Sequence, residues 1–164
     1  MPTTQTLARE DFTSVFRQHP AGVAVITLHD GERPVGFTAT SVISVSAEPA
    51  IFAFSINNTS SSWPALERAE RVTANLLADD QRAVSTTFAT SGIDRFAEVE
   101  WTQLPNGDPV LAGTASRISG RVLQRIPAGS SHLILVEADT AEVGGKEPLI
   151  YRNRAYHQLL EYQI

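Results

Sequence analysis

The chain contains no cysteine, and this absence removes several kinds of chemistry at once. Disulfides, thiolate nucleophiles, cysteine-ligated iron–sulfur clusters and thiol redox relays all require that residue. A redox function would therefore depend on a bound cofactor to carry the electrons. The 4 histidines are dispersed along the chain and form no H-x-x-x-H pair. We therefore predict no protein metal site.

Strong charge and long apolar runs are also lacking. The 164 residues carry a formal net charge of −5 with no block of like charges, which argues against nucleic acid or an anionic membrane as a partner. No apolar run approaches the roughly 20 residues of a membrane span. The N-terminus, MPTTQTLAREDF, has neither the basic nor the apolar region of a secretory signal. We expect a cytoplasmic protein with a single domain over residues 1–164.

Strand patterns outnumber helix patterns along the chain. Alternating or β-branched stretches predict strands at 21–29, 34–46 (with a bulge near Gly36), 50–57, 71–78, 110–126, 131–143 and 148–151. Helices are predicted at 10–18, 63–71 and 81–89, the last one capped by Asp79 or Asp80. The tail from residue 155 fits either a strand or a short helix. Because the strands follow one another in hairpin order, we predict a mainly β fold, an antiparallel barrel with a few helices.

The stretch NNTSSSWPAL (57–66) has two interpretations. In the first, it is a turn in which Ser62 caps a helix. In the second, it is an anion site, because the N–H groups at a helix N-terminus are unpaired and carry partial positive charge. A single cap needs one hydroxyl, whereas Thr59 to Ser62 supply four. This stretch alone leaves both interpretations open.

Other polar residues offer weaker signals. Thr38, Thr40 and Ser41 in GFTATS either suit a strand or line a flat polar ligand. Arg95 in DRF either faces inward to offset a phosphate or lies on the surface. Neither a G-x-G-x-x-G nor a P-loop motif is present, and no G-x-S-x-G marks a serine nucleophile. A Ser–His pair brought together by the fold stays open.

Taken in order, these pieces resemble the flavin reductase-like family of FMN-binding split barrels. The matching stretches are GVAVIT, VGFTATSVISVSAEPAIFAFSI, TSSSWPAL, ANLLADDQ, TTFA, DRF, PVLAGTAS, GSSH and PLIYRNRAY. Members of this family are the small reductase components of two-component flavin-dependent monooxygenases. The resemblance implies a six-stranded antiparallel Greek-key barrel with peripheral helices, assembled as a homodimer. It also implies FMN or FAD as the flavin and NADH or NADPH as the co-substrate.

The resemblance also implies roles for individual residues. Flavin-binding positions carry over, residue by residue, to Thr38, Ala39, Thr40, Ser41, Val42, Ser46, Thr59, Ser60, Ser62, Asn75, Leu76, Phe88, Arg95 and Tyr151. Among these, Thr59, Ser60 and Ser62 would hold the flavin phosphate, and Asn75 and Leu76 would contact the polar edge of the ring. His132 matches the histidine that helps to place the nicotinamide.

One departure from the family pattern concerns the nicotinamide. Relatives have Gly-Asp-His where this chain has Ser130-Ser131-His132. The main hypothesis is an NAD(P)H-dependent flavin reductase that supplies reduced flavin to a partner monooxygenase. The alternatives are a flavin-binding barrel without nicotinamide-dependent turnover and an interaction barrel that binds no cofactor.

Overall fold

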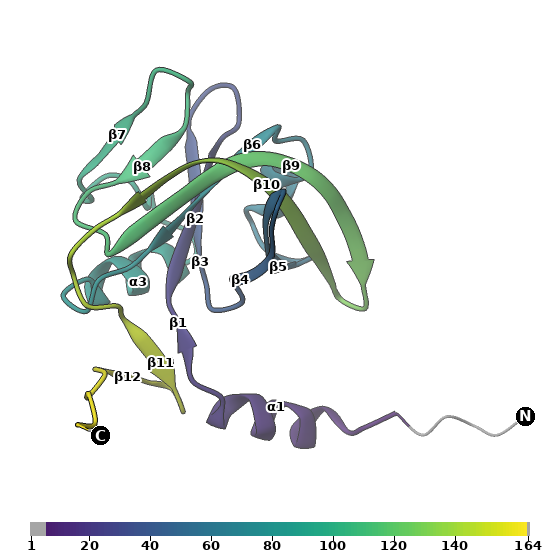
Figure 1. Cartoon of the computed structure of the whole chain (residues 1–164). Helices are drawn as coiled ribbons and strands as arrows, with labels where there is room; N and C mark the ends of the chain where they lie inside the picture. Colours follow the sequence, from purple (N-terminus) through teal and green to yellow (C-terminus); the bar gives the residue numbers. More distant parts are fainter. Residues whose placement is uncertain (1–5, 164) are drawn as a thin grey trace, which may run out of the picture.

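The structure is a computed structural model that describes residues 6–163 (Figure 1). In this part of the chain the helices are α1 (Arg9–Gln18), α2 (Trp63–Leu66) and α3 (Arg82–Ala89). The strands are β1 (Ala21–Gly22), β2 (Ala24–His29), β3 (Pro34–Ala39), β4 (Ile43–Ala47), β5 (Ala50–Asn57), β6 (Arg71–Leu76), β7 (Trp101–Gln103), β8 (Pro109–Leu111), β9 (Ser116–Ala128), β10 (Ser131–Val143), β11 (Ile150–Arg152) and β12 (Ala155–His157).

Within residues 6–163, the main sheet has seven strands in the order β3-β2-β6-β9-β10-β5-β4, and all neighbouring pairs are antiparallel. The long hairpin of β9 and β10 arches over the molecule in Figure 1 and carries the curvature of the sheet. Two small sheets, β1-β11-β12 and β7-β8, lie beside the main one. This arrangement confirms the predicted mainly β, antiparallel fold.

The sheet curls because alternate side chains on its inner face share one core. On β5 and β10 the inner positions are apolar and buried, whereas several of the positions between them are exposed. The rings of Phe37 on β3 and Phe54 on β5 lie 6.1 Å apart. This contact joins the inner faces of two strands that form no hydrogen-bonded ladder with each other. The barrel is therefore closed at this point by side-chain packing.

Strand β2 is buried on both of its faces. Ile26 and Leu28 belong to the barrel core, whereas Val25 packs with Phe88 of α3 and Leu149 in a second cluster outside the barrel. This double burial explains why 21–29 reads as a continuous apolar run rather than an alternating one. The second cluster fixes α3 against the outside of the sheet, next to β3.

The predicted strand at 34–46 is wrong as a single element, because it forms β3 and β4. These strands occupy opposite edges of the sheet, so residues 40–42 must carry the chain across the opening of the barrel. The hydroxyl of Ser41 accepts a hydrogen bond from the Ser55 N–H at 2.9 Å and ties this crossing to β5. Within residues 6–163, β4 is the edge strand that pairs with β5 in the seven-stranded sheet. The predicted bulge near Gly36 is wrong, because the register of β2 with β3 is regular there. The register shift occurs instead in the pairing of β4 with β5, between Ser44 and Ser46.

Two helix predictions also need correction. The predicted helix at 63–71 ends at Leu66, since the chain must extend again to enter β6 at Arg71. Helix α3 begins after Gln81, so neither Asp79 nor Asp80 is its cap. Instead, the Gln81 side chain accepts the Ala78 N–H at 2.9 Å. In the tail, residues 155–157 form β12, and no helix of the described residues is long and apolar enough to cross a membrane.

Candidate functional site

The turn at residues 57–62 is built by its own side chains. Asn57 Oδ1 accepts hydrogen bonds from the N–H of Thr59 at 2.9 Å and from its hydroxyl at 2.7 Å. Ser60 Oγ accepts the Ser62 N–H at 3.2 Å. These local bonds curl the chain directly after β5 and keep its hydroxyl groups at one end of the barrel.

The cap prediction for Ser62 is wrong. Ser62 precedes α2, but its side chain makes no capping hydrogen bond and is almost fully buried. Because α2 has only four residues, its dipole gives little field for an anion. The charge at this end of the barrel must therefore come from a side chain.

Arg95 supplies that charge. Its Nε donates to the Thr90 carbonyl at 2.9 Å, its Nη1 donates to the Gly36 carbonyl at 2.7 Å, and Ser62 Oγ lies 3.5 Å from Nη1. Partial burial lowers the pKa of Arg95 from its ordinary value. Within residues 6–163, no carboxylate forms an ion pair with it. The guanidinium is thus a partly desolvated cation whose charge is not offset locally.

A polar pocket of about 380 Å³ opens between the turn and Arg95. Its lining residues come from β3, β5, the turn and the end of α3, and most of them carry hydroxyl or amide groups. They are Phe37, Thr38, Ser55, Ile56, Asn57, Thr59, Ser60, Ser61, Phe88, Ala89, Ser91 and Arg95. Thr38 Oγ1 donates to the Ser85 carbonyl at 2.7 Å, which fixes its position against α3.

An apolar groove of about 390 Å³ lies beyond the chain crossing at 40–42. Its lining residues are Gly22, Val23, Val42, Ile43, Ser44, Ser46, Ala50, Ile51, Phe52, Leu76, Leu77, Ile118, Pro148 and Leu149. Val42, Ser46 and Leu76, all expected to contact a flavin, therefore meet in this groove. Thr38, Thr59, Ser60 and Arg95 meet in the polar pocket, and Ala39, Thr40 and Ser41 lie on the chain between the two.

His132 lies at the same end of the barrel but lines neither space. Strand pairing places it opposite Ile56, just before the turn. Its ring stacks on Trp63 with centroids 4.1 Å apart, and its Nδ1 is 2.6 Å from Asn58 Oδ1. This contact fixes the orientation of the ring, and within residues 6–163 Nε2 forms no hydrogen bond. Asn58 and Trp63 were not among the expected site residues.

The side-chain amide of Asn75, expected at the polar edge of a flavin ring, faces neither the polar pocket nor the apolar groove. Asn75 is fully buried, and its Nδ2 donates to the Val25 carbonyl and to Thr27 Oγ1, each at 2.9 Å. Its Oδ1 accepts the Leu111 N–H at 3.0 Å. These three bonds connect β6 to β2 and β8, so the amide is committed to the core.

The two aromatic residues expected to contact a flavin occupy different places in the structure. Phe88 is fully buried and meets Phe96 edge to face, with ring centroids 5.0 Å apart, so it supports the floor of the polar pocket. Tyr151 packs against Tyr156 with centroids 5.3 Å apart, in the second apolar cluster. Tyr151 lines neither the polar pocket nor the apolar groove.

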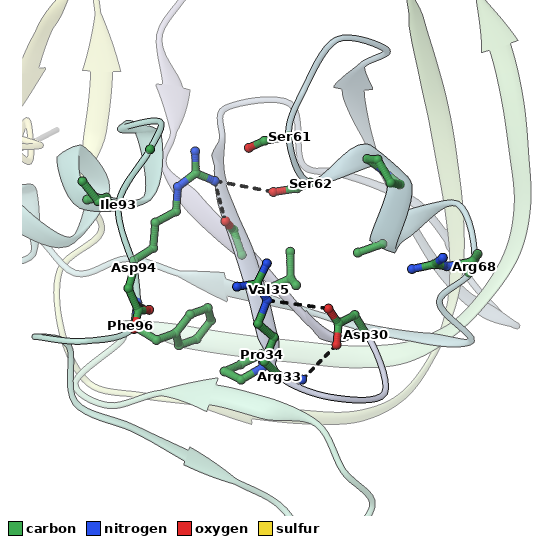
Figure 2. A pocket seen from close by; sticks show the side chains of 15 residues that line it. Asp30, Arg33, Pro34, Val35, Ser61, Ser62, Arg68, Ile93, Asp94 and Phe96 are labelled. Carbon is green, nitrogen blue, oxygen red and sulfur yellow. Dashed lines mark hydrogen bonds and ion pairs between the residues drawn. The ribbon is translucent and has the colours of Figure 1, made fainter.

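A third space of about 370 Å³ adjoins the polar pocket and shares Ser61 and Arg95 with it (Figure 2). It also contains Arg33 and Arg68, which the sequence had shown only as scattered basic residues. No local motif marks these two arginines, because they come from a hairpin turn and from the segment after α2.

Comparison with known proteins decides the family. A model described as the flavin reductase like domain matches residues 16–160. The chain belongs to this family. It is 42% identical over 154 residues to an NADH:FMN oxidoreductase of Rhodococcus erythropolis, covering 90% of this chain and 80% of the relative. It is 32% identical to the reductase subunit of a flavin-dependent monooxygenase of Rhodococcus jostii, covering 88% and 75% of the two chains.

A solved structure gives the same result. The flavin reductase domain protein of Arthrobacter sp. FB24 superposes with a TM-score of 0.89 at 35% identity, covering 96% of this chain and 100% of that one. These findings confirm the resemblance and the split-barrel fold that it implied.

The buried amide of Asn75 gives a test of its structural role. We expect Asn75→Ala to lower the free energy of unfolding by about 3 kcal/mol, because it leaves the buried partner groups on β2 and β8 unpaired. Urea denaturation followed by circular dichroism measures this loss. Asn58→Ala, at an exposed position, is the matched control and should cost less than about 1 kcal/mol. Equal small losses in both variants would contradict the assignment.

Proposed function

We propose that the protein is an NAD(P)H-dependent flavin reductase that hands reduced flavin to a partner monooxygenase. The observation that carries this proposal is the succession of an apolar groove and a polar, arginine-bearing pocket on either side of the crossing at residues 40–42. A flavin mononucleotide has the same succession, a flat aromatic ring system followed by a polar chain that ends in a phosphate. The relatives named as NADH:FMN oxidoreductase and as monooxygenase reductase subunit support the same activity.

The residues present fit this cofactor. Val42, Ser46 and Leu76 line the groove suited to the ring system. Ala39 at the end of β3 and Thr40 and Ser41 in the crossing lie where the polar chain of the flavin would pass. Ser60 and Arg95 suit the phosphate, because the Ser60 hydroxyl can donate to its oxygens and the guanidinium offsets its charge. Thr59 lines the same pocket, and its hydroxyl, which donates to Asn57 Oδ1 here, would turn toward the phosphate on binding. Ser62 assists through its contact with Arg95.

A flavin held in this site would supply the ring that takes up a hydride from a reduced nicotinamide, and the transfer would need no protein acid or base. The protein's task is to position the two rings and to exclude water. For the nicotinamide we retain His132, whose ring is oriented by Asn58 and Trp63. In that orientation its Nε2 is free to form a hydrogen bond with a carboxamide, which can donate as well as accept.

We propose that a second copy of the chain packs against helix α1. Figure 1 shows this helix projecting away from the sheet, and none of its residues is buried. Phe12 and Phe16 are 53% and 57% exposed, and their rings lie 4.8 Å apart on one side of the helix. On β4, Ile43 and Val45 are also exposed, and Ile43 lines the apolar groove. Apolar surface of this kind is typical of an interface, so we propose a homodimer.

Two further proposals follow from the activity. Reduced nicotinamide nucleotides are supplied inside cells, so we propose a cytoplasmic location. We also propose that residues 1–164 act as one flavin reductase-like domain, because the polar pocket draws on elements from β3 to the end of α3 and the groove reaches Leu149.

The activity is tested by adding FMN and then NADH or NADPH to the purified protein without oxygen. We expect the flavin absorbance near ~450 nm to disappear at a rate of about 1–1,000 turnovers per second. Stoichiometric flavin binding without bleaching by either nucleotide would instead identify a flavin-binding protein without reductase turnover. If no flavin binds, the protein is an interaction barrel.

Ser60→Asp is the variant that tests the phosphate position. Aspartate can still accept the Ser62 N–H, so we expect the melting temperature to change by only a few degrees. Its negative charge faces the phosphate, so FMN affinity should fall by tenfold or more. Thr102→Asp, which adds the same charge on the exposed β7 strand, is the control and should bind FMN normally. Parallel losses of stability and binding would mean that Ser60 serves only the fold.

Light scattering coupled to size-exclusion chromatography tests the dimer. We expect about twice the chain mass of 17.8 kDa for the wild-type protein and a shift toward the monomer for the double variant Phe12→Ser and Phe16→Ser. Leu123→Ser, at an exposed apolar position on β9, is the matched control. A monomeric wild-type protein would contradict the proposal.

A further inference from the structure

The turn at residues 57–62 has contacts on two sides. The residues before and after Asn58 line the polar pocket, whereas Asn58 itself lines none of the three spaces. The backbone N–H of Asn58 donates to the Ser130 carbonyl at 2.9 Å. Its side-chain oxygen lies 2.6 Å from Nδ1 of His132 on β10. One turn therefore contacts both the proposed phosphate position and the residue proposed for the nicotinamide.

The ring of His132 has two orientations that are compatible with its stacking on Trp63. The ring centroids are 4.1 Å apart and the planes are inclined by 21°, and Trp63 is itself packed against the barrel core. This stacking fixes the plane of the imidazole, but a half-turn about the bond that carries the ring leaves the plane unchanged and exchanges nitrogen positions for carbon positions. Within residues 6–163, the contact with Asn58 is the one hydrogen bond of this ring. Asn58 therefore selects the orientation, because a ring carbon in place of Nδ1 could not form that bond.

The position of Asn58 depends on the rest of the turn. Residues 57–59 are exposed, and Asn57 Oδ1 holds Thr59 through its N–H at 2.9 Å and its hydroxyl at 2.7 Å. The turn is thus shaped mainly by its own local hydrogen bonds. A phosphate held in the polar pocket would restrict the chain that follows Asn58. A turn that is already ordered loses less conformational entropy when a second ligand binds against it.

We propose that Asn58 is a positioning residue that couples the flavin phosphate to the binding of the nicotinamide nucleotide. The inference rests on the proposed reductase activity and adds a regulation of the same site. A flavin that carries a phosphate orders the turn, Asn58 then holds His132 in the orientation seen here, and the nucleotide binds more tightly. Riboflavin has the same ring system but no phosphate, so it occupies the groove without ordering the turn.

Steady-state kinetics with two flavins test this coupling. The KM of NADH or NADPH and the kcat are measured at saturating FMN and at saturating riboflavin, for the wild-type protein, for Asn58→Ala and for Ser131→Ala. Ser131 directly precedes His132 on β10, and its hydroxyl forms no hydrogen bond in the described part of the chain, so its replacement is the matched control. Neither residue is buried, so we expect both variants to melt within a few degrees of the wild type.

We expect the wild-type KM of the nucleotide to be about fivefold lower with FMN than with riboflavin, the factor that one hydrogen bond typically contributes. Asn58→Ala should raise the KM measured with FMN to the riboflavin value. Its kcat should change by less than about twofold, because the lost interaction serves binding. Ser131→Ala should keep the wild-type difference between the two flavins.

Reduction of both flavins by the wild-type protein with the same KM for the nucleotide would overturn the coupling and leave the reductase activity standing. An Asn58→Ala variant that keeps the wild-type difference, or that loses kcat instead of raising KM, would overturn the role of Asn58. So would a fall in its affinity for FMN alone, measured by fluorescence quenching, because Asn58 would then serve the flavin. If riboflavin is not reduced, the KM of Asn58→Ala with FMN decides, and an unchanged value overturns the proposal. Reduction of neither flavin would reject the proposed function and this inference with it.

Discussion

The site depends on one partly buried cation, Arg95, which forms no ion pair with any carboxylate of the described residues. The guanidinium of Arg95 holds the Gly36 carbonyl of β3 and the Thr90 carbonyl after α3, and it also reaches Ser62 before α2. These contacts join three segments that are distant in the sequence and define the walls of both spaces that share the arginine. They use Nε and Nη1, whereas within residues 6–163 Nη2 makes no hydrogen bond and the charge has no ion-pair partner, which is what the proposed phosphate site requires.

The second constraint is the crossing of the chain between β3 and β4. Strands β3 and β4 are the two edges of the sheet and do not pair with each other. Residues 40–42 connect them by passing over the opening between these edges. The hydroxyl of Ser41 fixes the crossing to β5. Apolar residues then gather on one side of it and hydroxyl groups on the other. The crossing at residues 40–42 thus separates the apolar groove from the polar pocket at the opening of the sheet.

How far the sequence alone could lead differs between these features. The strand patterns and the ordered motifs were sufficient to predict the fold and the family. A strand buried on one face has alternating apolar residues, and a strand buried on both faces has a continuous apolar run, so both can be recognised in the sequence. The residue pattern did not indicate that Asn75 is buried or that α2 is short. An asparagine at the end of a strand looks the same whether it faces a ligand or the core, and a helix start does not reveal where the next strand must begin. Arg68 and Asn58 were missed for a related reason, since only the fold brings them to Arg95 and His132.

A crystal structure of the protein with bound FMN tests the central claim most directly. The account predicts that the phosphate lies within hydrogen-bond distance of the Arg95 guanidinium and of the hydroxyl of Thr59 or Ser60. It also predicts that the ring system lies in the groove lined by Val42 and Leu76. A phosphate bound away from Arg95, or a ring system outside that groove, would contradict it.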